Sequence, residues 1–450
     1  MSSERGGRGP GLVSSLAGLE RVAGKCVLLY SGGLDSSYFM WWAAQRGIDL
    51  VALSVRLGAP DDPDADGLAA LPDELGHPLR VVDATEAFVE EHVRPAIRAN
   101  CLYQGIFPVS STLSRPLMAR IAVDLAREVG ADCVVHTAEF HQNSCARFNN
   151  SIRALAPELV VGNPLLEERI SRPEKLRALA GAVGERGIHS VDANIWARVI
   201  ENGELDSVAN RVPEHVFAWT RGPGRSTREP EELVLGFTGG VPTSLDGRAL
   251  PLRDLLTELN ARAGGFGIGR FNGVEDTRYG HKNHEVREAP AAAVVLAAHR
   301  HLEQVVLTGT ELRVKAALDH EWTDLVVAGG WYSTLRAALD RFQERISLPV
   351  HGEVGVVLAP GSAYVSWVDS PAALGGVADG VDDLSGGLSF ARAFDLGTAE
   401  LTSRQHLGEF GGPRVLEDDG RNRATQGGSA VGGAAQGGAA RVSSGTEQQR

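Results

Sequence analysis

Hydrophobic residues form short apolar runs along the chain, separated by amphipathic stretches. The runs lie at 26–30 (CVLLY), 49–58 (DLVALSVRLG) and 132–138 (DCVVHTA). Continuous apolar character over so few residues is typical of strands that are covered on both faces of a parallel sheet. Between the second and third runs, a hydrophobic residue recurs at every fourth position from Leu117 to Val129, which predicts an amphipathic helix beginning soon after Pro116. Alternating strands and helices predict an α/β, doubly wound first domain.

The length of the chain, 450 residues, predicts two domains plus tails. Disordered tails are predicted at 1–22 and 413–450, where glycine, alanine and polar residues leave too little apolar surface to offset the entropy of ordering. No apolar run approaches the roughly 20 residues that span a bilayer, and the N-terminus lacks the apolar core of a signal peptide. We therefore expect a cytoplasmic protein without a membrane partner.

The first apolar run leads into a glycine turn, SGGLDSS, at 31–37. Ligands of parallel sheets bind at the carboxyl ends of the strands, where this turn lies. The two glycines permit positive φ angles and close backbone approach, the following helix offers free N–H groups, and the two final serines add hydroxyl donors. The turn therefore favours an anion such as a phosphate, although no lysine follows the glycines as in a Walker A loop. The alternative is a strand-to-helix turn in which Asp35 and Ser36 act as caps.

Charge and cysteine content exclude some classes of protein. A net charge of −13 argues against a nucleic-acid partner, because a phosphate-binding surface needs concentrated Lys and Arg. Four cysteines without a C-x-x-C pair predict neither a disulfide framework nor a zinc ribbon. Two histidine pairs, His136 with His141 and His281 with His284, have spacings that occur in zinc sites. No third ligand is evident, so hydrogen bonding is the better interpretation.

The pattern strand-S-G-G-x-D-S at the start of an α/β domain resembles the PP-loop of the N-type ATP pyrophosphatases. Six further stretches resemble, in family order, one group of that superfamily, the argininosuccinate synthases. They are YQGIFPVSSTLSRPLMARI (103–121), DANIWARVIENGELD (192–206), FTGGVP (237–242), GGFGIGRFNGVEDTRYGHK (264–282), REAPAAAVVLAAHRHLE (287–303) and GGWYSTLRAALDRF (329–342). The resemblance covers roughly residues 25 to 400.

The resemblance implies a domain organisation and a reaction. A PP-loop ATP pyrophosphatase domain is expected at 23–189, an α+β synthetase domain at 190–375, and a C-terminal oligomerisation segment of a homotetramer at 376–412. In the implied reaction, ATP adenylates the ureido oxygen of citrulline and pyrophosphate (PPi) leaves. The amine of aspartate then displaces AMP and forms a C–N bond. Catalysis of this kind depends mainly on positioning and charge stabilisation.

The implied ATP-binding residues belong to the PP-loop and to the ends of the neighbouring strands. They are Leu29, Tyr30, Ser31, Gly32, Gly33, Leu34, Asp35, Ser36, Ser37, Val55 and Thr137. Asp35 and Ser36 are the implied catalytic residues. The implied metal is Mg²⁺, bound through the ATP phosphates and the Asp35 carboxylate.

Several residues match substrate-binding positions of the family. Arg147 stands where the family has an arginine on the citrulline carboxylate, and Glu275 stands where it has the carboxylate that receives the α-amine. Asn143 matches a substrate-contacting asparagine, Thr112 conservatively replaces a serine, and Arg115 matches the arginine of an Ala-Arg-Pro segment. An arginine together with a glutamate suits the two charges of an amino-acid head. For either residue alone, a structural ion pair is the alternative.

The loop TAEFHQNSCAR at 137–147 departs from the family pattern. Glu139 replaces the threonine that contacts aspartate, Ser144 replaces the aspartate that contacts its amine, and 140–142 replace a lysine and glycines. A glutamate added to a site for the acidic side of aspartate costs on the order of 1 kcal/mol or more when partly desolvated. Aspartate is therefore a doubtful nucleophile for this chain.

The implied citrulline pocket also departs from the pattern. Phe107 replaces a tyrosine, Val199 replaces a serine, and Arg287 replaces a second tyrosine. Three lost hydroxyls and an added guanidinium indicate a changed ligand, since a buried polar partner left unpaired costs about 1–3 kcal/mol. Arg287 predicts either an additional acidic group on the substrate or an ion pair with Glu285 or Glu288.

The sequence thus predicts an argininosuccinate synthase-like, AMP-forming C–N ligase. It would adenylate a ureido or carboxyl oxygen of an amino-acid-like substrate and join that substrate to an amine, with changed substrates that suit specialised metabolism. One alternative is a genuine argininosuccinate synthase of arginine biosynthesis, and another is a non-catalytic nucleotide-binding paralogue. A tRNA sulfur-transfer enzyme shares the PP-loop, but the acidic charge and the absence of paired cysteines oppose it.

Overall fold

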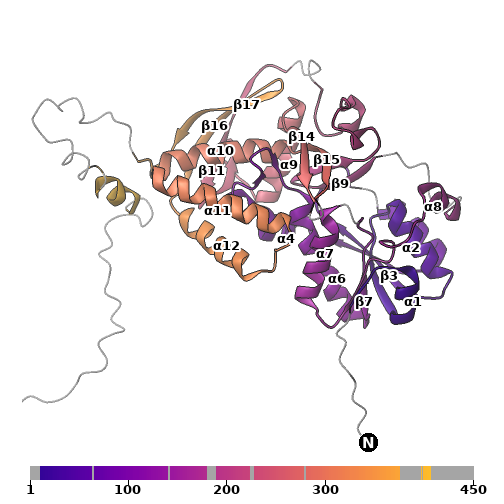
Figure 1. Ribbon diagram of the computed structural model, residues 1–450. Coiled ribbons are helices and arrows are strands. Elements are labelled where there is room, and N and C mark those ends of the chain that lie inside the picture. Colours follow the sequence, from indigo (N-terminus) through magenta and orange to yellow (C-terminus); the bar gives the residue numbers. More distant parts are fainter. Residues whose placement is uncertain are drawn as a thin grey trace, which may run out of the picture.

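The computed structural model describes residues 11–62, 65–139, 142–179, 189–222, 228–277, 280–374, 397 and 399–406 of the chain. Figure 1 shows two units side by side, the first built on a parallel sheet and the second on antiparallel sheets with long helices. The predicted fold class, an α/β domain followed by an α+β domain, is confirmed.

A six-stranded parallel sheet in the order β1-β8-β7-β2-β3-β4 forms the first unit. Its strands are β1 (Leu12–Val13), β2 (Lys25–Leu29), β3 (Asp49–Arg56), β4 (Leu79–Asp83), β7 (Cys133–Val135) and β8 (Val160–Gly162). Cys26 and Leu28 of β2 belong to the hydrophobic core on one face, and Val27 between them belongs to the core on the other. Because both faces are covered, the strands read as continuous apolar runs. All three predicted strands are confirmed.

Helices cover the two faces of this sheet. One face is covered by α1 (Leu16–Val22), α2 (Leu34–Ala44), α3 (Ala65–Leu75) and α8 (Arg172–Ala178), and the other by α6 (Ser111–Val129) and α7 (Asn143–Leu155). The predicted amphipathic helix is α6, but it begins at Ser111 rather than after Pro116. Its first turns are stabilised by burial of Leu113 and Pro116, and the Tyr332 hydroxyl donates to the Pro116 carbonyl at 3.0 Å.

Residues 11–22 differ from the expected disordered tail. Leu12 pairs with Val161 of β8, and α1 follows, with its N-terminus capped by Ser15, whose Oγ accepts from the Gly18 N–H at 3.2 Å. Leu16 and Leu19 of α1 are buried in the core on the α2 side of the sheet. Half of the residues in this segment are apolar, and Leu16 and Leu19 complete a core to which β2, α2 and α3 also contribute. Residues 1–10 and 413–450 of the predicted tails lie outside the described residues.

The segment between β4 and α6 packs into the second unit. It comprises α4 (Thr85–Phe88), the π-helical turn η1 (Val89–Val93), α5 (Arg94–Arg98), β5 (Leu102–Tyr103) and β6 (Phe107–Pro108). Phe88, Ile97 and Phe107 are buried in the same hydrophobic core as Trp196 and Leu259 of the second unit. The two units therefore share a core, which places the end of this segment at the junction between them.

Two antiparallel sheets and four long helices build the second unit. One sheet has the order β14-β15-β10-β9, with β9 (Ser190–Asn194), β10 (Ala197–Glu201), β14 (Arg270–Asp276) and β15 (Lys282–Glu288). The other has the order β13-β12-β11-β16-β17, with β11 (Glu231–Thr238), β12 (Val241–Leu245), β13 (Arg248–Ala249), β16 (Gly352–Ala359) and β17 (Ser362–Asp369). The helices are α9 (Leu252–Gly265), α10 (Pro290–Val306), α11 (Gly309–Val327) and α12 (Thr334–Ile346), and two 3-10 turns are η2 (Gly203–Asp206) and η3 (Glu214–Val216).

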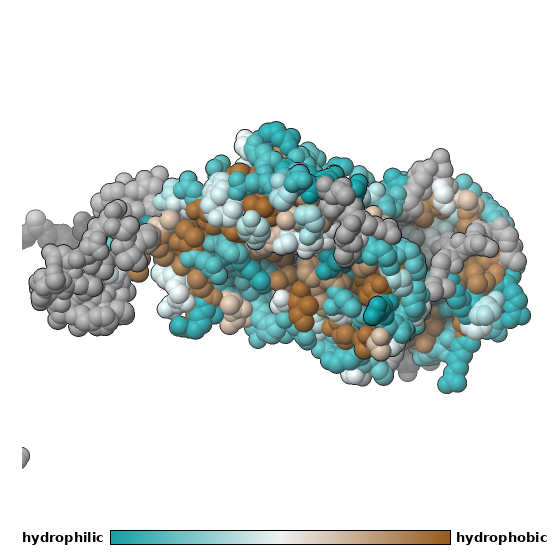
Figure 2. Space-filling view, turned by 90° about the horizontal axis from the view of Figure 1, so that it is seen from above, coloured by the Kyte–Doolittle hydropathy of each residue, from teal (hydrophilic) through white to brown (hydrophobic). Residues whose placement is uncertain are grey.

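On the face of the molecule shown in Figure 2, hydrophobic side chains appear in separate groups among hydrophilic ones. Among the described residues, no helix combines the length and the hydropathy needed to cross a membrane. Of the predicted oligomerisation segment 376–412, only 397 and 399–406 are described. There, Gln405 donates to the Glu311 carboxylate of α11 at 2.7 Å. Assembly into a homotetramer stays a prediction.

The core of the second unit contains a neutral histidine. His299 of α10 is fully buried, and its Nδ1 lies 2.8 Å from Oδ1 of Asn100. Burial first, and then the charge of Lys315, lower its pKa to about 3. An unfolded chain binds a proton at this histidine near pH 6.5, whereas the folded chain does not until far lower pH. Its contribution to stability is therefore complete above pH 6.5 and is lost as the pH falls toward 3.

We expect His299→Gln to weaken the pH dependence of folding. Between pH 7 and pH 5 the wild type should lose about 2 kcal/mol of unfolding free energy through this residue, and the variant should not. Urea unfolding of both proteins at the two pH values measures the difference. His301→Gln, the same exchange on the exposed face of α10, is the control. An equal pH-dependent loss in His299→Gln and wild type would contradict the expectation.

Candidate active site

The glycine turn at the end of β2 has the geometry of an anion-binding loop. Gly32 has a φ of +68°, a left-handed conformation that favours glycine. Gly33 occupies the N-cap position of α2, where no side chain caps the first N–H groups. Those groups are free to donate to a ligand at the positive end of the helix dipole. A Cβ atom on Gly32 would lie 2.8 Å from Cδ2 of Leu68, so the loop also leaves no room for a side chain.

Hydrogen bonds within the turn fix the side chains of two of its serines. Ser31 Oγ accepts from the Gly33 N–H at 3.2 Å, and Ser36 Oγ donates to the Gly33 carbonyl at 3.2 Å. The hydroxyl of Ser37 is buried and has no hydrogen-bond partner within the described part of the chain. The alternative in which Asp35 and Ser36 cap α2 is not found, because no side-chain cap bond is present.

The other implied nucleotide residues come to the same edge of the sheet. Leu29 ends β2, and the Tyr30 N–H donates to the carbonyl of Leu53 at 2.8 Å, which ties the start of the turn to β3. Val55 lies near the carboxyl end of β3, and Thr137 follows β7, the neighbour of β2 on the other side. These residues thus lie at the carboxyl ends of three adjacent parallel strands, as expected for a site in an open α/β sheet.

A lysine from α8 contacts the glycine turn. Lys175 Nζ donates to Asp35 Oδ1 at 2.7 Å, and both side chains are largely buried. Sequence reasoning missed Lys175, because 140 residues separate it from Asp35 and the pattern carries no signal for the contact. Its ammonium adds a positive charge beside the first turn of α2. The carboxylate of Asp35, the predicted metal ligand, is therefore already occupied by a cation of the chain.

We expect Lys175→Met to raise the KM for ATP about tenfold, because a charge-assisted contact beside the phosphate position is lost. Steady-state kinetics with varied ATP measures the change. Lys25→Met is the matched control, since Lys25 forms a lysine–aspartate pair with Asp49 at 3.3 Å at the opposite edge of the sheet. Equal effects of the two exchanges on the KM for ATP would show that Lys175 acts only through the net charge of the protein and not through a contact at the phosphate position.

A buried ion pair lies where α7 of the first unit meets β14 of the second. Arg147 Nη2 and Asn143 Nδ2 both donate to Glu275 Oε1 at 2.8 Å. Arg147 Nε also donates to the carbonyl of Val327 at 3.0 Å, and its Nη1 donates to Ser111 Oγ at 2.9 Å. The three matching residues of the implied amino-acid site are therefore brought together. In this structure Arg147 and Glu275 neutralise each other.

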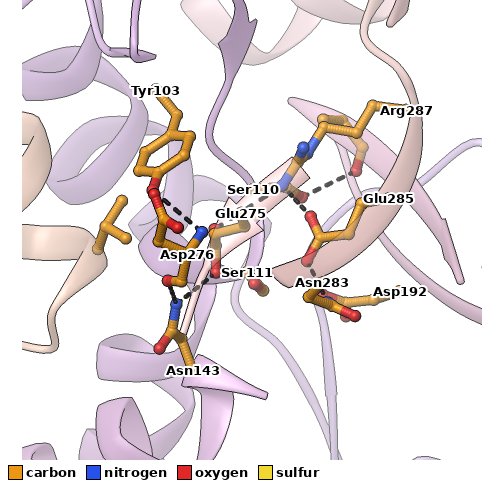
Figure 3. A network of polar contacts seen from close by, with 12 residues as sticks. Tyr103, Ser110, Ser111, Asn143, Asp192, Glu275, Asp276, Asn283, Glu285 and Arg287 are labelled. Carbon is orange, nitrogen blue, oxygen red and sulfur yellow. Dashed lines mark hydrogen bonds and ion pairs between the residues drawn. The ribbon is translucent and has the colours of Figure 1, made fainter. Parts of the chain in front are cut away.

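The departing residues of the predicted pocket lie beside this pair. Arg287 of β15 contacts Glu285, lies 3.8 Å from Glu275 Oε2, and places its guanidinium carbon 3.8 Å from the centre of the Phe107 ring. Val199 of β10 is buried and is the strand partner of Arg287. Figure 3 shows Glu285 between Arg287 and Asn283, whose Nδ2 donates to Glu285 Oε1 at 2.9 Å.

Arg287 forms one of the two ion pairs that were predicted as the alternative to a substrate contact. It pairs with Glu285, whereas Glu288 accepts from Arg198 and from backbone N–H groups of 218–220. Arg287 is buried rather than exposed, and its Nε and Nη1 have no hydrogen-bond partner among the described residues. Two donors therefore remain for a ligand.

Two further glutamates belong to the cluster, and Glu201 was not predicted. Glu285, one of the two carboxylates predicted to pair with Arg287, lies on the same face of β15 as that arginine. Glu201 ends β10 and accepts from Gln142 Nε2 at 2.6 Å. Burial, and then repulsion from Glu285, raise the pKa of Glu201 well above its usual range. Burial opposes ionisation of Glu275 too, but Arg147 and Arg287 outweigh it and lower its pKa.

The remaining predicted residues lie around the cluster. Thr112 is buried in the first turn of α6, and Arg115 of the same helix pairs with Asp192 at 2.9 Å. Ser144 is buried in the first turn of α7, and Glu139 is exposed in the loop that leads to this helix. Phe140 and His141 lie outside the described residues.

A hollow of about 330 Å³ opens next to the cluster. It is lined by Tyr103, Gln104, Asn143, Asp276, Thr277, His320, Asp324, Val327 and Ala328. Tyr103 donates to the Asp276 carboxylate at 3.2 Å (Figure 3). Gln104 donates to the same carboxylate at 3.1 Å, and the two contacts tie the segment before α6 to β14. Asn143 joins this hollow to the buried pair.

The glycine turn can bind phosphate at the carboxyl ends of the parallel strands, and the Arg147–Glu275 pair suits an amino acid. Together they indicate an ATP-using enzyme of the PP-loop class. Residues 25–182 match the sequence model described as the arginosuccinate synthase N-terminal HUP domain, and residues 189–377 match that of the arginosuccinate synthase C-terminal domain. The chain belongs to the argininosuccinate synthase family. It is an argininosuccinate synthase-like, ATP-dependent ligase.

Curated relatives agree with this assignment. An argininosuccinate synthase of Rubrobacter xylanophilus is 38% identical over 356 residues, which are 78% of this chain and 87% of the relative. One from Pyrobaculum aerophilum is 36% identical over 372 residues, 81% of this chain and 93% of the relative. A solved complex of a 4-thiouridine synthetase with RNA and ATP covers 34% of this chain and 39% of its own, at 22% identity and a TM-score of 0.25. That likeness is too partial to add to the assignment.

Proposed function

We propose that the protein activates an amino-acid-like substrate as its adenylate and then joins it to an amine. A ureido or carboxyl oxygen of the substrate attacks the α-phosphorus of ATP, the bond to the β-phosphate breaks, and PPi leaves. The amine nitrogen then attacks the activated carbon, the bond between that carbon and the AMP oxygen breaks, and the amine gives up a proton. The products are AMP, PPi and a new C–N bond.

The glycine turn supports the first half-reaction. Its uncapped N–H groups and the hydroxyl of Ser37, which has no partner among the described residues, are donors in fixed positions, and fixed donors stabilise the charge that develops on phosphate oxygens. Asp35 Oδ1 accepts from Lys175, and the other carboxylate oxygen, Oδ2, is a hard ligand that fits Mg²⁺, which when bound would neutralise phosphate charge. Lys175 supplies a second positive charge at the same place.

The contacts of Arg287 are the observation that carries the proposal of a changed substrate. A guanidinium stacked on the Phe107 ring and paired with Glu285 stands where the family resemblance implies a pocket with two tyrosine hydroxyls. Val199 removes a third hydroxyl from the facing position on β10. A ligand that relies on those hydroxyls loses its partners, which costs about 1–3 kcal/mol for each buried group.

Charge balance limits what the new ligand can be. Arg147 and Arg287 face Glu275 and Glu285, and the raised pKa of Glu201 favours its neutral form. Burial raises the pKa of Glu285 as well, but the charge of Arg287 opposes this shift. With Glu285 ionised in its pair with Arg287, the cluster holds two cations and two anions, without surplus positive charge for an additional acidic group. It favours a substrate with a zwitterionic amino-acid head and a neutral oxygen acceptor for Nε and Nη1 of Arg287.

A genuine argininosuccinate synthase, acting on citrulline and aspartate, is the second candidate. It is favoured by the match of both family models and by relatives of that name at 36–38% identity over more than three quarters of this chain. Retention of Asn143, Arg147 and Glu275 in mutual contact suits either candidate.

Reversion of the departing residues tests the proposal. We expect Phe107→Tyr, Val199→Ser and Arg287→Tyr, combined in one variant, to lower the KM for citrulline at least about tenfold, because the lost hydroxyls return. A second variant, Glu139→Thr with Ser144→Asp, should instead lower the KM for aspartate. Release of PPi and AMP with ATP, citrulline and aspartate is measured for both variants and the wild type. Efficient wild-type turnover that both reversions leave unchanged would favour the genuine synthase.

A further inference from the structure

Two histidines and one glutamate converge at the edge of the sheet that contains β9 and β10. His189 directly precedes β9, Glu204 lies in η2 after β10, and His215 lies in η3. Their ligand atoms all lie within 4.8 Å of one another. No residue of this cluster takes part in the candidate active site, and neither histidine pair considered from the sequence contributes to it.

Distances between the three side chains suit a small transition-metal ion. His189 Nε2 lies 3.1 Å from Glu204 Oε2, and His215 Nε2 lies 3.7 Å from Glu204 Oε1. A tetrahedral ion with bonds of about 2.0–2.2 Å separates its ligand atoms by roughly 3.3–3.5 Å. The centres of the two imidazole rings are 5.8 Å apart, with the rings tilted by 48°. Small side-chain rotations, above all of the exposed His215, would bring the three ligand atoms to these tetrahedral separations.

The buried nitrogen of His189 points at the carboxylate of the cluster. Nε2 of His189 is inaccessible to solvent and lies 3.1 Å from Oε2 of Glu204. A cation between the nitrogen and the carboxylate would be bound by both groups.

Neighbouring contacts hold the two turns in place. Leu205 follows Glu204, Val216 follows His215, and both are buried in one hydrophobic cluster with Ile200 and Val286 of the sheet. Asn210 Nδ2 donates to the carbonyl of Glu204 at 2.8 Å. The backbone on either side of the cluster is thus anchored before a ligand binds, which reduces the entropy that binding must overcome.

Similar anchors join the turn after β10 to the start of β9. Asn202 Nδ2 donates to Ser190 Oγ at 2.9 Å, directly beside His189. Nδ1 of His284 on β15 lies 2.5 Å from the carbonyl of Leu205 and holds η2 against the sheet. His284, considered for a metal from the sequence, therefore supports the turn that carries Glu204.

We propose that His189, Glu204 and His215 form a binding site for Zn²⁺ or a similar borderline-soft divalent ion, with water as the fourth ligand. Two imidazoles select against Mg²⁺ and Ca²⁺, which prefer oxygen ligands, and favour Zn²⁺, Cu²⁺ and Ni²⁺. The ion crosslinks the start of β9 to the two turns after β10. Strand β10, which pairs with β9, carries Val199 and Glu201 of the candidate substrate cluster. The ion therefore restrains the end of the sheet that lies beside this cluster.

Zinc titration of the full-length, tag-free protein tests the site. The protein is first stripped with a chelator and then titrated by calorimetry without nucleotide, so that no phosphate competes for the metal. We expect one Zn²⁺ per chain with a Kd of about 10⁻⁶ M or lower, and at least about tenfold weaker binding in His189→Ala, in His215→Ala and in Glu204→Gln. Mg²⁺ and Ca²⁺ should give no saturable heat.

His301→Ala is the control, because it removes an exposed histidine on α10 and should bind Zn²⁺ as the wild type does. His215 is largely exposed, so its replacement leaves the fold intact even if His189→Ala does not fold. Electron paramagnetic resonance of the Cu²⁺-loaded protein should show two nitrogen ligands in the wild type and one in His215→Ala. Binding that is not saturated by about 100 µM Zn²⁺, or that survives all three ligand replacements, would overturn the proposal.

Discussion

Replacing Gly32 with alanine will reduce ATP-dependent release of PPi at least about a hundredfold, the loss typical of removing one donor from a preorganised anion site. A φ of +68° is unfavourable for alanine, and the added Cβ would lie 2.8 Å from Cδ2 of Leu68. The turn must shift, and the N–H groups of the uncapped α2 terminus shift with it. Initial rates of PPi release at saturating substrates measure the loss.

Gly47→Ala separates this effect from simple backbone strain. Gly47 has a φ of +64°, almost the same as that of Gly32, but no heavy atom lies within 4 Å of its added Cβ. It also lies at the far end of α2, away from the glycine turn. Both exchanges should cost a similar backbone energy of about 1–2 kcal/mol, but only Gly32→Ala should lose activity. Comparable activity losses in both would argue against an anion site at the turn.

Glu275→Gln will destabilise the protein by about 3–5 kcal/mol and abolish the ligase reaction. Glu275 and Arg147 are both almost completely buried, and removing one partner of a buried ion pair leaves the other charge uncompensated. Arg287 loses a neighbouring carboxylate in the same exchange. The free energy of unfolding is measured by urea denaturation, and activity is measured below the unfolding range.

The matched control is Glu258→Gln. Glu258 of α9 pairs with Arg248 of β13 at 2.7 Å, a distance similar to that of the buried pair, but the two side chains are 33% and 56% exposed. Its loss should cost less than about 1 kcal/mol and leave activity unchanged. If Glu275→Gln were as mild as this control, the buried pair could not be the anchor of an amino-acid site.

The parallel sheet could be predicted from the sequence because its signals are local. Strands β2 and β3 are covered on both faces, so each contains a continuous apolar run, at 26–29 and 50–53, and the glycine turn follows β2 directly. Residues 11–22 could not be recognised in the same way. Their apolar side chains are distributed over two short elements, β1 and α1, which pack against β8 and α2 from distant parts of the sequence.

Site residues that belong to a continuous sequence motif could be predicted. Those that contact the site from a distant part of the sequence could not. Arg147 and Glu275 stand in recognisable stretches, and the fold brings them within 2.8 Å. Lys175 reaches Asp35 across 140 residues, and Glu201 joins the cluster through the pairing of β10 with β15. Such contacts depend on topology, which local patterns do not encode.

We propose that this chain, a ligase of the argininosuccinate synthase type, acts on changed substrates. The most direct test measures AMP and PPi released by the purified wild type with ATP, citrulline and aspartate, beside a panel of ureido, guanidino and carboxyl compounds paired with different amines. We expect slow turnover of citrulline with aspartate and faster turnover of another pair. Turnover of citrulline with aspartate at about 1 per second or more, faster than any other pair, would contradict it.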